Sequence, residues 1–169
     1  ELILGQIKVE DKSNEITAIP LLLDSLLIKG STVTIDAMGC QKSIARQIVK
    51  KQADYVLSVK DNQPELQEEI VDSFRMLPIN DYYEEVDYGH GRIENRKCSI
   101  ITDLSLMFCS NKWAGLRSVV KIERERIFKA TGKVEKDINY YISTLTKAPI
   151  IGKSARKHWG IENKVHWVL

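Results

Sequence analysis

Val33-Thr34-Ile35-Asp36-Ala37-Met38-Gly39-Cys40-Gln41 ends an apolar strand on a carboxylate and leads directly into a helix. Ligand sites of α/β proteins gather at such strand ends. A second acid, Glu162, lies far along the chain in the amphipathic stretch His158-Trp159-Gly160-Ile161-Glu162-Asn163. Two isolated acids on ordered elements indicate a divalent-cation site, because hard cations prefer carboxylate oxygens.

Composition bounds the class of protein. The chain has 169 residues and is 43% hydrophobic, which predicts one domain with a real core. Its 25 basic and 23 acidic residues leave a net charge of +2, so the balance neither requires nor excludes nucleic acid. Three cysteines without a Cys-x-x-Cys spacing argue against a disulfide framework or a zinc ribbon. With no membrane-spanning or signal pattern, we expect a cytoplasmic protein.

The first third of the chain alternates strand and helix patterns. Apolar runs and spacings of three and four predict a strand at 2–9, a helix at 16–27, a strand at 33–37, a helix at 42–51 and a strand at 55–59. Alternation of this kind predicts a parallel α/β sheet.

The pattern then changes to one helix followed by alternating stretches with one wet face. The helix is expected at 65–74, and the strands at 82–88, 92–101, 119–130 and 134–145, with turns at 89–91 and 131–133. These strands predict an antiparallel extension of the sheet or an inserted β layer. The closing segment, 154–169, returns as a helix that carries Glu162.

The ends of the chain predict a fragment of a longer protein. It starts at Glu1 without methionine and stops on Trp167-Val168-Leu169 without a helix-stop signal. We expect a single domain over 1–169, in which 1–77 forms the core, 78–150 the β-rich extension and 151–169 the last helix.

Seven ordered segments resemble the ISAs-type insertion-sequence transposases, which include the H-repeat-associated proteins of bacteria. They are Gly5-Gln6 through Lys8, Asp11 to Ile16, Thr34 to Gln41, Lys60 to Gln63, His90 to Glu94, Tyr140 to Ser143 and His158 to Asn163. The likeness covers essentially the whole chain in the family's order.

The resemblance implies a DDE transposase, with an RNase H-like core whose three acids hold two divalent cations for DNA strand cleavage and strand transfer. It maps the second acid to Asp36 and the third to Glu162, with Mg²⁺ or Mn²⁺ as the cation. The first acid of the family lies upstream of 2–9, so the fragment alone is expected to be inactive. Implied partners are the insertion-sequence ends, target DNA and further copies in a synaptic homo-oligomer.

Basic and polar residues near these acids are candidate DNA contacts. They are Lys60, Asn62, Gln63, Arg92, Arg96, Arg156, Lys157, His158, Asn163 and Lys164. Two alternatives stay open: Arg92, Arg96 and Arg124 alternate with acids and equally predict cross-strand ion pairs, and 60–63 equally predicts a turn.

Two other functions are compatible with the sequence. One is a different RNase H-like metal nuclease, and the other is a non-catalytic interaction domain decayed from a mobile element. His158, Glu162 and His166 share a helical face and suggest zinc, but a clear further ligand is missing.

Overall fold

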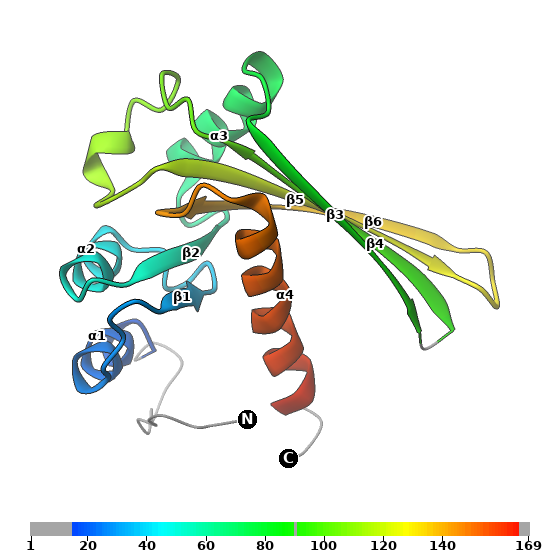
Figure 1. The fold of residues 1–169 in the computed structure, drawn as a ribbon, viewed down its shortest axis with the longest axis horizontal. Helices are drawn as coiled ribbons and strands as arrows, with labels where there is room; N and C mark the ends of the chain where they lie inside the picture. The colour runs from blue at the N-terminus through cyan, green and yellow to red at the C-terminus, as the bar shows by residue number, and fades with distance from the viewer. Residues whose placement is uncertain (1–14, 90, 166–169) are drawn as a thin grey trace.

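The computed structural model describes residues 15–89 and 91–165, and side chains within 16–89 and 91–158. Four α-helices accompany a single six-stranded sheet in these residues (Figure 1). The helices are α1 (Glu15–Ser25), α2 (Lys42–Lys50), α3 (Pro64–Met76) and α4 (Ala148–Val165). The strands are β1 (Thr32–Ile35), β2 (Asp54–Val59), β3 (Asp81–Gly89), β4 (Arg92–Ile101), β5 (Ser118–Phe128) and β6 (Val134–Ser143), with a 3-10 turn η2 (Ser110–Lys112) before β5.

The sheet is mixed. Its strand order is β1-β2-β6-β5-β4-β3, in which β1 and β2 are parallel and every other pair is antiparallel. The expected α/β class is therefore confirmed in its mixed form. The predicted strand at 2–9 lies outside the described residues.

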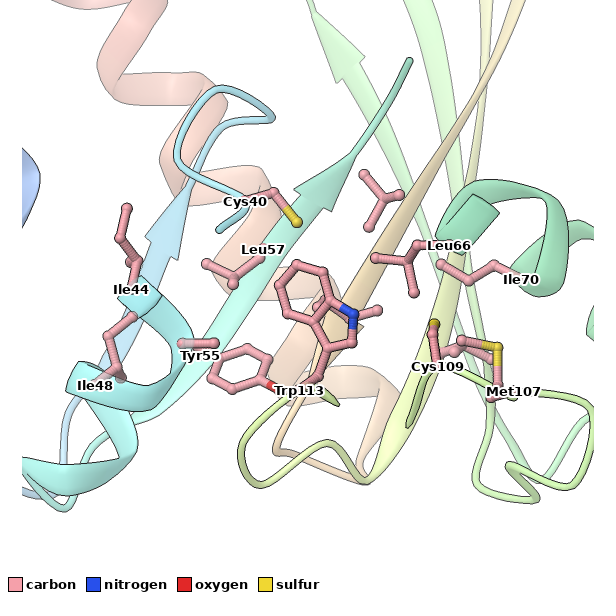
Figure 2. Close-up of a cluster of buried hydrophobic side chains, with 14 of the residues drawn as sticks. Cys40, Ile44, Ile48, Tyr55, Leu57, Leu66, Ile70, Met107, Cys109 and Trp113 are labelled. Atoms are coloured by element: carbon pink, nitrogen blue, oxygen red, sulfur yellow. The ribbon is translucent and has the colours of Figure 1, made fainter. Parts of the chain in front are cut away.

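Helices cover both faces of the sheet. On one face, α2 and α3 bury apolar side chains against β2, with Trp113 in the middle of the cluster (Figure 2). On the other face, α4 packs Ala148, Ile151 and Ala155 onto β2, β4, β5 and β6. Apolar residues recur every three or four positions in these segments because one side of each helix packs against the sheet.

The four strands β3 to β6 continue well beyond the helices as a twisted antiparallel ribbon (Figure 1). Side chains of β3 alternate between half-buried and exposed, which is the pattern of a sheet that faces water. Gly91 and Gly132 have φ of +72° and +66° in the two connecting turns, a conformation that glycine adopts without steric cost. The predicted antiparallel extension is observed.

The start of α4 differs most from the sequence prediction among the described boundaries. Helix α4 begins at Ala148, six residues before the predicted start at 154. The Ala148 N–H donates to Asp81 Oδ2 at 2.9 Å, and Ile151 is fully buried. Pro149 fits the first turn because its missing N–H is not needed there. A tertiary contact thus starts the helix earlier than its apolar stripe indicates.

Cys40 gives the fold a dependence on alkaline pH. Burial raises the pKa of its thiol from 9.0 to about 12. Because the folded protein holds the thiol proton more tightly than the unfolded chain, the contribution of Cys40 to stability is fully present below pH 9. It is lost as the pH rises from 9 towards 12. Between pH 8 and pH 10, Cys40 is expected to lower the free energy of unfolding by an amount on the order of 1 kcal/mol. Urea unfolding at both pH values measures this, and Cys40→Ala must lose that part of the pH dependence; an unchanged dependence contradicts it.

Candidate active site

Asp36 stands at the exposed carboxyl end of β1. Its Oδ1 accepts a 3.3 Å hydrogen bond from the Gly39 N–H, and the carboxylate faces solvent. The weak bond leaves most of the carboxylate's lone pairs open. An oxygen ligand for a hard cation needs that kind of exposure.

The loop that follows Asp36 is held from two sides. The Asn62 side chain donates to the Ala37 carbonyl at 2.6 Å, and Gln63 donates to the Cys40 carbonyl at 2.9 Å. Gly39 is packed so closely that a Cβ there would lie 2.2 Å from Cγ2 of Ile35. These contacts fix the backbone next to Asp36.

Helix α4 is attached to β1 beside this loop. The Thr34 hydroxyl and His158 Nδ1 share a hydrogen bond of 3.2 Å. Thr34 precedes Asp36 by two residues and therefore points to the same side of the strand. The structure thus brings His158, a predicted DNA contact, next to β1.

Glu162 follows His158 by one turn of α4, whose backbone is described through Val165. The side chains of Glu162, Asn163 and Lys164 lie outside the described residues, as does His166. Their predicted roles stay predictions. Within the described side chains, no group of three or more His, Cys, Asp or Glu is arranged to hold a metal ion.

Lys60, Asn62 and Gln63 form a turn at the edge of the sheet where Asp36 lies. The Gln63 N–H bonds to the Lys60 carbonyl at 2.9 Å, and Lys60 is exposed. The turn alternative is therefore observed for this segment. Contact of these residues with DNA stays a prediction.

Arg92 and Arg96 surround a buried carboxylate on the ribbon. Glu94 is 4% exposed and pairs with Arg96 at 2.6 Å and Arg92 at 3.4 Å. On the neighbouring strands, Arg124 makes bonds of 3.0 and 2.6 Å to Asp137. A cross-strand ion pair is therefore present for Arg124, whereas Arg92 and Arg96 pair with a carboxylate of their own strand β4. Phosphate contact by Arg92 and Arg96 stays a prediction.

Arg156 joins α4 to the edge strand. Its guanidinium pairs with Glu85 and donates to Asp87 at 2.6 Å, while the neighbouring Lys157 is exposed. The sequence predicted DNA contact for both residues. In the structure Arg156 orients α4, a role that its spacing to β3 could not reveal.

Two residues contribute to this region although their local sequence does not indicate it. Thr34 lies in an ordinary strand pattern, and Gly39 lies in an ordinary turn pattern. The sequence around Gly39 indicates a tight turn, but the close approach of Gly39 to Ile35 and Ile19 depends on packing.

None of the helices that the structure describes is long and apolar enough to cross a membrane.

Comparison with known proteins gives a consistent family. The model of the transposase DDE domain matches residues 1–169. Putative protein YbfL of Escherichia coli K12 is 41% identical, over 99% of this chain and 47% of that protein. H repeat-associated putative transposase YhhI of the same strain is 40% identical, over 99% and 47%. Putative transposase YncI of Escherichia coli O157:H7 is 40% identical, over 99% and 45%.

These relatives confirm the resemblance that the ordered motifs indicated. The chain spans about half the length of the curated relatives that it matches. Its motifs, its mixed α/β sheet and its match over every residue agree, and the chain belongs to the transposase DDE domain family.

Proposed function

We propose that this chain forms part of an RNase H-like catalytic core of an insertion-sequence transposase, in which Asp36 and Glu162 hold divalent cations for DNA strand cleavage and strand transfer. Membership of the transposase DDE domain family supports the class of enzyme. The observation that carries the residue assignment is the contact of Thr34 with His158.

That contact matters because it ties α4 to the strand that leads into Asp36. Thr34 precedes Asp36 by two residues, and His158 precedes Glu162 by four. Ala148 bonds to Asp81 and Arg156 bonds to Asp87, so α4 is also held along β3.

Each acid follows its member of the Thr34–His158 contact by a short step along its element. Four residues of helix advance about 6 Å, and two residues of strand advance about 6.6 Å. Because both acids are this near to one contact along the chain, the contact supports a site that the two acids share.

The donor set suits Mg²⁺ or Mn²⁺. Mg²⁺ takes one or two protein carboxylates plus phosphate oxygens and water, so a sparse set of acids suffices. Asp36 and Glu162 would hold such cations at this edge, and the cations would supply activation of water or a 3′-hydroxyl and charge stabilisation of the leaving oxygen. Asp36 contributes an exposed carboxylate on a braced loop, and Lys60 at the same edge contributes positive charge towards a phosphate.

Iron-directed cleavage of the polypeptide tests the assignment without measuring activity. The chain is incubated with Fe²⁺, ascorbate and hydrogen peroxide, so that hydroxyl radicals cut the backbone beside a bound ion. Cuts are expected next to Asp36 and next to Glu162, and excess Mg²⁺ is expected to suppress both.

Asp61→Asn is the matched control, because Asp61 is an exposed acid in the turn after β2. Asp36→Asn should abolish both cuts, whereas Asp61→Asn should keep them. Cuts confined to other segments, or cuts that survive Asp36→Asn, reject the proposed cation site.

A further inference from the structure

The outer face of α2 carries an unbroken stripe of positive charge. Lys42, Arg46 and Lys50 are spaced four residues apart and are all exposed, so they share one side of the helix. Helix α2 contains no acidic residue. None of the three cations forms an ion pair with a described side chain.

Five arginines elsewhere in the molecule are used differently. Arg92, Arg96, Arg124, Arg126 and Arg156 all pair with carboxylates of the ribbon. The α2 cations therefore do not serve the internal ion-pair network. They are left available for a negatively charged partner.

Lys42 also stands against the helix dipole. It occupies the first residue of α2, where the macrodipole favours an acid and disfavours a cation. A charge placed against local stability indicates a function outside the fold.

The stripe is continued by a groove between α1 and α2. Its volume is about 600 Å³, and its lining includes Ser43, Arg46 and Lys50. The one acid in the lining, Asp24, accepts a 2.7 Å hydrogen bond from Gln47. Lys51 donates to the Leu23, Asp24 and Leu26 carbonyls and so ties α2 to the end of α1.

Position connects this surface to the candidate active site. Helix α2 begins one residue after the loop of Asp36, and it runs away from that edge along the outside of the sheet (Figure 1). Lys42 is thus nearest to Asp36 along the chain, and Lys50 is two turns away. The cations are about 6 Å apart along the helix axis, which is close to twice the axial rise of about 3.4 Å per phosphate on one DNA strand.

We propose that Lys42, Arg46 and Lys50 form a sequence-independent binding surface for the phosphate backbone of DNA, which holds the duplex that leaves the catalytic edge. This inference rests on the proposed function for the identity of the nucleic acid. The surface positions DNA and takes no part in the chemistry.

Salt-dependent DNA binding by the 169-residue chain tests the surface. Fluorescence anisotropy with a labelled duplex measures the affinity between 50 and 200 mM KCl. Each lost phosphate contact lowers the slope of log K against log salt by about 0.9. The variant Lys42→Gln/Arg46→Gln/Lys50→Gln should lower the slope by about 2 to 3 and weaken binding at the lowest salt by more than about tenfold.

The matched control is Lys112→Gln/Arg117→Gln/Lys129→Gln, which removes three exposed cations from other segments. This control variant should change the slope of log K against log salt by less than about 0.9, the value expected for one phosphate contact. If both triple variants weaken DNA binding equally, the loss of affinity follows from the lower net charge of the chain, and the proposal is overturned. The proposal is also overturned if the unmodified chain does not bind DNA. It is likewise overturned if the α2 variant loses self-association while its affinity for DNA is unchanged.

Failure of this proposal is separable from failure of the proposed function. An unchanged slope in the α2 variant rejects the surface but leaves iron-directed cleavage at Asp36 intact. Loss of the Asp36 cuts rejects the cation site whatever the slope shows. Thermal unfolding of both triple variants establishes that each remains folded.

Discussion

Replacing Asp36 with asparagine is expected to lower the rate of DNA strand cleavage by at least about 10³-fold. A bound metal supplies several kcal/mol of transition-state stabilisation, and 1.36 kcal/mol corresponds to a factor of ten in rate. Asparagine keeps the size of the side chain and removes the charge that we propose holds the cation. Because Asp36 is exposed, the variant should unfold at nearly the same temperature.

Cleavage is measured with the full-length protein, DNA that carries the ends of the insertion sequence, and Mg²⁺. Asp61→Asn, which removes an exposed acid from the neighbouring turn, should cleave at close to the original rate. If the Asp36→Asn variant cleaves DNA at the full rate, the proposed metal-binding role of Asp36 is wrong. The fate of the product separates two enzymes: a transposase joins the 3′-hydroxyl to a second DNA, whereas a simple nuclease releases it.

Replacing Trp113 with alanine is expected to cost about 3–5 kcal/mol of folding free energy. Trp113 is 3% exposed and fills the space between β2 and the segment before β5 (Figure 2). Alanine leaves a cavity next to Tyr55 and Leu57, because β2 is held in place by strands on both sides. Urea unfolding measures the loss, and the melting temperature should fall by roughly 6–20 °C.

Trp113→Phe is the control for cavity size. Phenylalanine keeps much of the ring contact and removes an indole N–H that is buried without a hydrogen-bond partner among the described residues. It should therefore cost far less than alanine. A loss below about 1 kcal/mol for Trp113→Ala would show that the cluster closes around the gap and that Trp113 does not hold β2.

Local patterns predicted most of the elements. Strand β4 occupies the predicted 92–101, and the other described strands differ from their predicted bounds by no more than two residues at either end. The alternation that produces these strands depends on near neighbours alone, since each residue pair decides which side faces water. The start of α4 was wrong because Ala148 depends on Asp81, which is 67 residues away.

Some features of the candidate site also follow from local sequence, whereas others depend on distant contacts. The position of Asp36 at a strand end follows from an apolar run that stops on a carboxylate. The role of Glu162 as an acid of the site is predicted only by the resemblance of the ordered motifs, and it stays a prediction. The role of Arg156 does not follow, because its ion pairs to Glu85 and Asp87 bridge two elements. Thr34 likewise became part of the site only when α4 was placed against β1.

Local sequence patterns are sufficient to predict the family, the α/β class and the sheet edge at which an acid lies. Those properties depend on residue order and on periodicities of two and 3.6, which neighbouring residues define. Tertiary structure alone decided which arginines are consumed in ion pairs and which cations of α2 remain exposed. Pairing across strands depends on register and twist, and these are set only when distant segments pack together.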